Sequence, residues 1–186
     1  MGFYTREELK KIGFKSVGEN VLISDKCSIY SPENIEIGNN VRIDDFCILS
    51  GNIKIGNYIH ISAFSALYGG AGIIMEDFTC LSARGLVYSV SDDYTGEFLT
   101  NPIIPEKYRG VSKAKVIFKK HSLVGAGSII LPGVILEEGT SVGANSLITK
   151  STEEWSIYAG SPAKKIKDRK KELLELERKF LKEEKR

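Results

Sequence analysis

The sequence predicts an all-β protein, a parallel β-helix wound as a three-walled prism, with a loop excursion and a C-terminal α-helix. Three observations lead to this prediction. Large apolar residues recur at every sixth position, a stretch of 28 residues interrupts them, and the last residues follow a helical spacing. With 186 residues, of which 42% are hydrophobic, the chain can bury a core without disulfide bridges. We therefore expect one domain over residues 1–164 and a helix over residues 165–186.

The period of six is the strongest pattern in the chain. It fits neither the 3.6-residue turn of an α-helix nor a plain alternating hairpin, but it fits a short strand followed by a corner. Three such units form a coil of 18 residues, so the eighteen ladder positions give about six coils with parallel strand pairing. The alternative is a β-sandwich, in which turn signals would recur every 8–12 residues. The ladder positions are Val17, Ile23, Ile29, Ile37, Ile43, Leu49, Ile55, Ile61, Leu67, Met75, Leu81, Val87, Phe118, Val124, Ile130, Leu136, Val142 and Ile148.

The ladder is interrupted over residues 88–115, which we expect to leave the prism as an excursion. Connections of this length are usually functional or disordered, and the aromatic content of this one favours order. Asp92, Asp93, Tyr94 and Asn101 could supply hydrogen-bond donors and acceptors to a substrate. A purely structural flap is the alternative interpretation.

Pro162 ends the repeat, and the apolar residues that follow it are spaced by threes and fours, as on a helix that could cap the core. Residues 161–186 contain 11 Lys and Arg against 6 Asp and Glu, whereas the rest of the chain contains 15 against 18. The body is therefore mildly acidic, which excludes a whole-domain nucleic-acid footprint but allows a phosphate contact near the tail.

The remaining composition narrows the class of protein further. No apolar run approaches the roughly 18–20 residues of a membrane span, and no secretory signal is evident, so a cytoplasmic protein without membrane insertion is expected. Three cysteines, an odd number, argue against a disulfide framework. No Cys and His set has zinc-ligand spacing, so we expect no metal.

One outward-facing column predicts a partner. In the second six-residue unit of each coil, the residue just before the ladder position should point outward. On successive coils this residue is nevertheless mostly apolar. An outward apolar column on a soluble prism indicates a buried face, which predicts self-association as a closed cyclic oligomer. The column consists of Ile48, Ala66, Leu86, Ile129 and Leu147.

Four segments resemble the acyltransferase branch of the hexapeptide-repeat family: Gly-Ala-Gly-Ser at 125–128, Leu-Pro-Gly-Val at 131–134, Val-Gly-Ala-Asn-Ser at 142–146 and Tyr-Ala-Gly-Ser-Pro-Ala-Lys at 158–164. The resemblance covers residues 17–169. It implies a left-handed parallel β-helix, a homotrimer with active sites at subunit boundaries, and acetyl-CoA as co-substrate. The handedness comes from the resemblance alone, because parallel crossovers are generally right-handed.

The same resemblance implies a set of coenzyme-binding residues. Two of them are small alanines one coil apart, which would let a slender pantetheine arm lie along the prism, and three are lysines that could meet the CoA phosphates as point charges. A merely solvated lysine-rich tail is the alternative. The implied residues are Ala126, Ala144, Thr149, Lys150, Lys164 and Lys167.

Acyl transfer from a thioester needs a nucleophile, a group that takes its proton and stabilisation of the developing oxyanion. The chain has two histidines. His60 should point outward, one coil from Cys80 and the coil that bears the excursion, whereas His121 should lie at a corner. We expect His60 and Asp93 to be catalytic, with His121 as the other possible base; either histidine could instead be a solvated surface residue.

The chain departs from part of the family at one place. Galactoside, maltose and xenobiotic acetyltransferases carry a histidine early in the excursion, where this chain has Asp92 and Asp93. A neutral amine needs less help than a hydroxyl to act as nucleophile. Ser-Asp-Asp-Tyr-Thr-Gly at 91–96 and Ile-His-Ile-Ser-Ala at 59–63 resemble the nucleotide-amino-sugar acyltransferases of O-antigen synthesis, notably the dTDP-4-amino-4,6-dideoxyglucose type.

The resemblance thus implies transfer of an acetyl group from acetyl-CoA to the amino group of a nucleotide-linked amino-deoxy sugar in O-antigen or capsule polysaccharide synthesis. A sugar-hydroxyl acetyltransferase of the galactoside or maltose type, or an acetyltransferase of chloramphenicol or streptogramin, is the alternative. A γ-type carbonic anhydrase would need three histidines on one zinc, and a scaffold without catalysis would not need the excursion.

Overall fold

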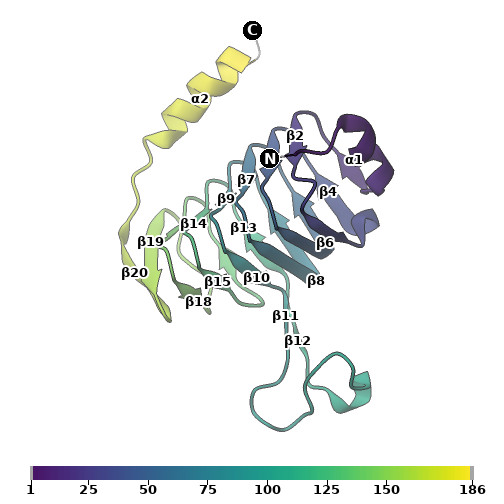
Figure 1. Ribbon diagram of the computed structural model, residues 1–186. Coiled ribbons are helices and arrows are strands. Elements are labelled where there is room, and N and C mark those ends of the chain that lie inside the picture. The colour runs from purple at the N-terminus through teal and green to yellow at the C-terminus, as the bar shows by residue number, and fades with distance from the viewer. Residues whose placement is uncertain (1, 185–186) are drawn as a thin grey trace.

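The computed structural model describes residues 2–184, a parallel β-helix with an excursion and a C-terminal helix (Figure 1). The predicted fold class is confirmed. Met1 and residues 185–186 lie outside the described residues, so the last two positions of the expected helix are not described.

Three walls of parallel strands form the prism. Wall one consists of β1 (Ser16–Val17), β4 (Ile35–Ile37), the second halves of β6 (Ile48–Ile55) and β8 (Ala66–Met75), β13 (Val116–Phe118) and β16 (Ile135–Leu136). Wall two consists of β2 (Val21–Ile23), β5 (Val41–Ile43), β7 (Ile59–Ile61), β9 (Cys80–Leu81), β14 (Leu123–Val124), β17 (Ser141–Val142) and β19 (Ser156–Gly160). Wall three consists of β3 (Ser28–Tyr30), the first halves of β6 and β8, β10 (Leu86–Tyr88), β15 (Ile129–Ile130) and β18 (Leu147–Ile148).

The ladder residues form the core. Every ladder position except Val17 and Ile29, which are half-buried on the first coil, is fully enclosed. Wall two contains seven parallel strands, so the expectation of about six coils is corrected to about seven turns. The seventh turn was missed because its wall-two strand, β19, carries Tyr158 instead of an aliphatic residue at the inward position below Val142.

Helix α1 (Arg6–Ile12) closes the N-terminal end of the prism. Thr5 and Glu8 form a capping box at its start, which satisfies the first free amide groups of the helix. Leu9 is its buried residue and joins the core. A short 3-10 turn, η1 (Pro32–Asn34), leads from the first coil to the second.

The excursion projects from the body as a two-stranded stalk with a looped tip (Figure 1). The stalk pairs β11 (Val90–Ser91) with β12 (Ser112–Lys113) in antiparallel register, and the tip contains the 3-10 turn η2 (Glu106–Tyr108). Buried Ser89 anchors the stalk, because its hydroxyl donates to the Tyr68 carbonyl and accepts from the Ala71 amide. The predicted excursion over residues 88–115 is therefore ordered.

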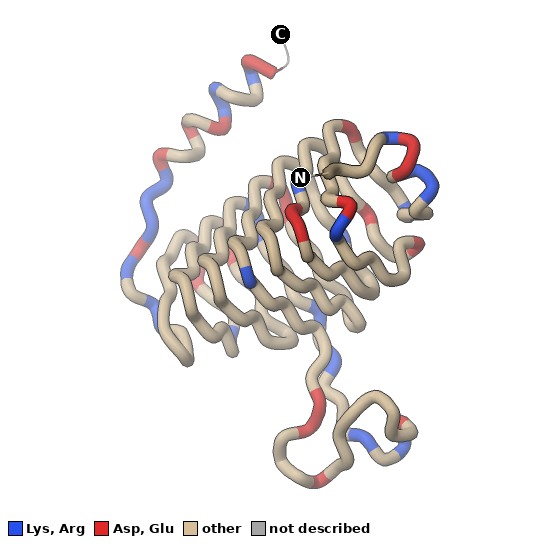
Figure 2. The backbone as a smooth tube through the Cα atoms, viewed as in Figure 1, with Lys and Arg blue, Asp and Glu red and all other residues tan. Residues whose placement is uncertain are grey.

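The C-terminal segment corrects one prediction. Residues 163–168 form a strand, β20 (Ala163–Asp168), antiparallel to β19, and the helix α2 begins only at Leu173 and ends at Glu184. The strand forms because the last coil leaves an open edge whose amide and carbonyl groups need partners. The strand, and not the expected helix, therefore covers that edge. Figure 2 shows Lys and Arg concentrated along the chain between the prism and α2.

Candidate active site

His60 lies on wall two in a column of outward residues that the strand register defines. Arg42 pairs with His60, His60 with Cys80, Cys80 with Leu123, and Leu123 with Ser141. The predicted placement of His60 one coil from Cys80 is thus confirmed. Burial raises the pKa of the Cys80 thiol, which disfavours a thiolate nucleophile at this point.

An aspartate that the sequence analysis did not assign holds His60 in place. Nε2 of His60 lies 2.8 Å from Oδ2 of Asp44, and Nε of Arg42 donates to Oδ1 of Asp44 at 2.7 Å. The Asp44 side chain is 11% exposed, against 43% for His60. Burial opposes ionisation of Asp44, but the hydrogen bonds from Arg42 and His60 outweigh it and lower its pKa. A ring that donates through Nε2 keeps Nδ1 as its basic nitrogen.

A stripe of alanines runs along the corner between walls two and three. The amide groups of Arg84, Gly127 and Asn145 donate in turn to the carbonyls of Ala63, Ala83 and Ala126, which places these corners on top of one another. Ala144 follows one coil below Ala126, as predicted. No side chain fits at Gly125 beside these alanines, because even a Cβ there would lie 2.6 Å from the backbone nitrogen of Ala144. The alanine stripe is Ala63, Ala83, Ala126 and Ala144.

The lysines predicted to meet CoA are divided between two places. Lys164 on β20 pairs with Ala159 and Lys167 with Ile157, so both lie where the alanine stripe ends. Thr149 and Lys150 are exposed at the next corner, past the end of β18. None of these three lysines forms an ion pair within residues 2–184. Their neighbour Lys165, in contrast, is bound by Glu153 and Asp168, which raise its pKa.

A groove of about 560 Å³ lies between the excursion and wall three. Tyr88, Asp92 and Tyr94 line it from the excursion side, and Ile129 and Leu147 line it from the wall. Tyr94 is 92% exposed, and burial raises the pKa of Tyr88. The groove therefore combines an apolar floor with one carboxylate and two phenol groups.

Two of the three expected substrate residues, Asp92 and Tyr94, line this groove. The backbone amide of Asn101 donates to Oδ2 of Asp92 at 3.3 Å, and Tyr94 lies two residues beyond Asp92 on the same loop. The three residues therefore belong to one part of the excursion, and their role in substrate binding stays a prediction.

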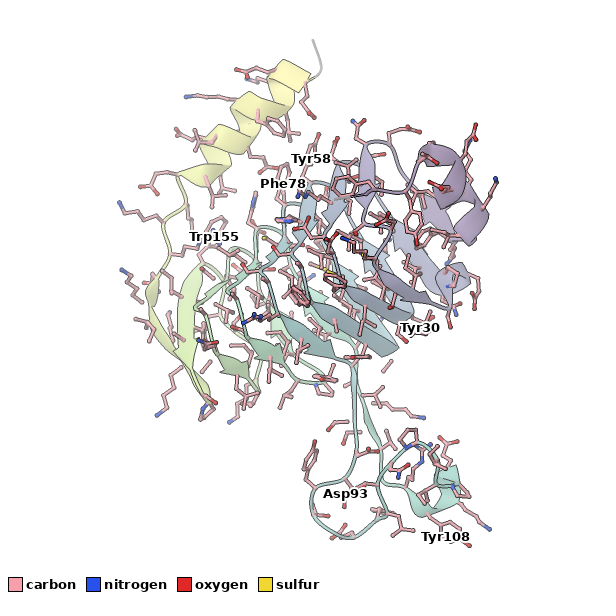
Figure 3. All side chains as sticks on the ribbon, in the orientation of Figure 1. Tyr30, Tyr58, Phe78, Asp93, Tyr108 and Trp155 are labelled. Carbon is pink, nitrogen blue, oxygen red and sulfur yellow. The ribbon has the colours of Figure 1, made fainter. Side chains whose placement is uncertain are left out.

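Asp93 occupies a different environment from Asp92. Its carboxylate accepts hydrogen bonds from the hydroxyl and amide of Thr95, at 2.8 and 3.1 Å, and from the amides of Gly96 and Phe98, at 2.9 and 3.4 Å. The Thr95 hydroxyl and these amides lower its pKa. Asp93 therefore shapes the loop, and Figure 3 shows it in the excursion, away from the prism body. Within one chain, no contact joins Asp93 to His60, which lies on wall two.

His121, the other possible base, is not available to solvent. Its side chain is 6% exposed, and its Nε2 lies 3.0 Å from Oε2 of Glu177 on α2. Its ring stacks on that of Phe78, with centroids 5.4 Å apart. Sequence reasoning missed Glu177 and Asp44 alike. Asp44 could have been found, because it follows a ladder residue on the coil next to His60.

The chain resembles known acyltransferases over its whole length. No protein-family model matches it. The dTDP-4-amino-4,6-dideoxy-D-glucose acyltransferase of Escherichia coli is 45% identical over 183 residues, which are 97% of this chain and 95% of that protein. The chain belongs to this acyltransferase family. Members of the family use acyl-CoA donors, so the predicted enzyme class and co-substrate are confirmed.

A solved structure agrees with this assignment. AntD, an N-acyltransferase from Bacillus cereus in complex with dTDP and 3-hydroxybutyryl-CoA, is 56% identical and superposes with a TM-score of 0.98 over 99% of this chain and 98% of that chain. A variant of AntD is in complex with dTDP-4-amino-4,6-dideoxyglucose and coenzyme A. By contrast, the chloramphenicol acetyltransferase of Klebsiella aerogenes matches over only 46 residues, a quarter of this chain, at 41% identity.

Among residues 2–184, no cluster of three or more His, Cys, Asp or Glu side chains could hold a metal ion. No helix in that part of the chain is long and apolar enough to cross a membrane.

Proposed function

We propose that this protein transfers an acyl group from acyl-CoA to the 4-amino group of dTDP-4-amino-4,6-dideoxyglucose, for O-antigen or capsule polysaccharide synthesis in the cytoplasm. The observation that carries the proposal is the full-length likeness to AntD, which binds this amino sugar and CoA in one set of structures. The excursion of this chain agrees with an amine acceptor, because it contains carboxylates and no histidine.

The active site lies between two subunits of a homotrimer. Two observations support this part of the proposal. The column of Ile48, Ala66, Leu86, Ile129 and Leu147 stacks on wall three, where four of its five members keep part of their apolar surface in solvent. The excursion groove and the wall that bears His60 also face different directions in one chain, so a neighbouring copy is needed to bring them together.

The excursion side of the site supplies a carboxylate from Asp92. Solved structures of AntD include variants in which one serine is replaced and variants in which one aspartate is replaced. The serine and the aspartate are ten positions apart in that chain. Ser82 and Asp92 have the same spacing here. Ser82 lies at the corner after β9, beside Ala83 of the alanine stripe, and Asp92 lines the groove. We therefore place Asp92 at the substrate amine and keep Asp93 as the residue that holds the loop.

The reaction needs one proton transfer. The neutral amine attacks the thioester carbonyl, a C–N bond forms, the C–S bond breaks and CoA leaves as a thiolate. The amine proton passes to a nearby base, for which the Asp92 carboxylate and Nδ1 of His60 are the candidates, and ends on the CoA sulfur. Asp44 keeps the His60 ring in this tautomer.

The donor lies along the alanine stripe. Ala126 and Ala144 leave room for the pantetheine arm, and Lys164 and Lys167, at the end of the stripe, meet its phosphate groups. Thr149 and Lys150, at the next corner, contact the same coenzyme from the other side of wall three.

A thiol-release assay tests the proposal. Acetyl-CoA and 3-hydroxybutyryl-CoA are offered with dTDP-4-amino-4,6-dideoxyglucose, with neutral sugars and with chloramphenicol. We expect thiol release only with the amino sugar, with the new amide confirmed by mass spectrometry. Faster release with a neutral sugar or chloramphenicol would contradict the proposed acceptor.

A further inference from the structure

Four aromatic rings stack along the corner between walls one and two, which we call the aromatic corner. Tyr58, Phe78, His121 and Trp155 each occupy the left-handed backbone region there, so their side chains project from the same corner on four of the coils. The ring centroids of Tyr58 and Phe78 are 4.7 Å apart, and those of His121 and Trp155 are 6.2 Å apart across the glycine-bearing coil between them. Tyr58, Phe78 and Trp155 are labelled in Figure 3, on the side of the prism that faces α2.

Helix α2 docks on this corner. Phe180 meets the rings of Tyr58 and Phe78 edge-on, with centroids 5.3 and 6.4 Å away, and the Tyr58 hydroxyl donates to Glu184. Edge-to-face contacts of this kind favour one orientation of the helix over others. The helix is therefore held against coils that are far from it in sequence.

A largely buried carboxylate holds the second turn of α2. Glu177 accepts from Nζ of Lys120 at 2.5 Å and contacts Nε2 of His121 at 3.0 Å, and its side chain is 10% exposed. Burial opposes its ionisation, but Lys120 and His121 outweigh that effect and lower its pKa. Removal of Lys120 and His121 would leave the Glu177 carboxylate largely buried without compensation, whereas Lys120 is 38% exposed and can be solvated.

The chain between β20 and α2 is tied to the same corner. Nη1 of Arg169 donates to the carbonyls of His121 at 2.8 Å and Gly139 at 2.9 Å, and its amide donates to the carbonyl of Trp155. His121 thus holds the C-terminal segment twice, through its carbonyl and through its ring. Only four residues separate β20 from α2, so the same corner holds the C-terminal end of the strand and the start of the helix.

We propose that His121 and Glu177 are positioning residues, which clamp α2 so that β20 presents Lys164 and Lys167 to the phosphate groups of acyl-CoA. This inference rests on the proposed role of the two lysines. It predicts that loosening the clamp weakens binding of the phosphate-bearing donor and leaves the chemical step intact, because no clamp residue touches the reacting atoms.

The test compares two donors in the full-length protein. Acetyl-CoA carries the phosphates, and acetyl-pantetheine lacks them. In Glu177→Ala we expect KM for acetyl-CoA to rise about tenfold, which corresponds to the loss of about one charge-assisted contact between a lysine and a phosphate. We expect kcat and the KM for acetyl-pantetheine to stay within about twofold. Glu177→Gln, which can still accept hydrogen bonds, should recover part of the loss. Glu175→Ala, at an exposed position on the same helix, is the matched control.

Hydrogen exchange supplies the second readout. The amides of α2 and β20 should exchange faster in Glu177→Ala than in Glu175→Ala. An unchanged KM for acetyl-CoA, unchanged exchange in α2, or an equal rise of KM for both donors would each overturn the clamp. If the double variant Lys164→Ala/Lys167→Ala leaves KM for acetyl-CoA unchanged, the proposed donor site itself is wrong. The positioning role of His121 and Glu177 is then wrong as well.

Discussion

Replacement of Asp44 by asparagine separates the orientation of His60 from the stability of the fold. The substitution keeps the size of the side chain and removes its charge. Asp44 contacts Arg42 at 2.7 Å and His60 at 2.8 Å. An asparagine has one amide oxygen that can accept a hydrogen bond, and its NH₂ group cannot accept one from the other donor. One of the two contacts is therefore lost, and the other no longer involves a carboxylate.

The magnitude follows from these two contacts. A hydrogen bond to a charged group contributes about 1.5–3 kcal/mol. The side chains of Arg42 and His60 are 49% and 43% exposed, so solvent screening reduces the combined loss to about 1–2 kcal/mol. For a chain of this size, that corresponds to a fall in Tm of about 2–8 °C. Turnover should fall further, about tenfold or more, because an unheld His60 loses its fixed tautomer and a general base contributes roughly 10²–10⁴-fold.

The control is the neighbouring residue. Asp45 accepts from Ser24 at 2.5 Å and from Lys26 at 3.2 Å, so Asp45→Asn also removes a paired carboxylate without touching His60. Tm and the pH profile of kcat are measured for both variants. We expect similar losses of stability and a fall in kcat only for Asp44→Asn. Equal kcat values in the two variants would refute the role of Asp44 and, with it, that of His60 as a base.

Two further predictions concern assembly and pH. Ile129→Asp places a charge in the apolar column of wall three and should dissociate the oligomer in sedimentation experiments; an intact oligomer would exclude this face as the interface. The pKa of Glu177 is lowered in the folded protein, so its stabilising effect is complete above the unfolded pKa of about 4.3 and is lost as pH falls through the lowered value. The protection of the α2 amides, corrected for the pH dependence of intrinsic exchange, should accordingly fall below about pH 4 in wild type and change less in Glu177→Ala, and an equal fall in both would count against the pair.

The prism could be predicted because the residues of its core recur at a short, fixed spacing in the sequence. A β-helix places every sixth residue inside, so the ladder from Val17 to Ile148 can be read without knowledge of distant contacts. The position of His60 one coil from Cys80 followed from the same arithmetic.

The C-terminal strand could not be predicted in this way. Residues 163–168 are rich in lysine and compatible with a helix, and they become a strand only because the edge of β19 is available. Here tertiary context overrides local propensity. The clamp between His121 and Glu177 was hidden for a related reason, since it joins residues 56 positions apart.

The claim that one active site is built from two chains is tested by mixing two inactive variants. His60→Ala damages the wall-two side of the site, and Asp92→Asn damages the excursion side. After joint unfolding and reassembly in equal amounts, random pairing around a closed ring leaves about one quarter of the sites with both sides intact. We expect recovery of about 25% of wild-type turnover from the mixture, although each variant alone is nearly inactive. No recovery from a mixture that has demonstrably exchanged subunits would mean that both residues serve the same site within one chain, and would rule out a site shared between subunits.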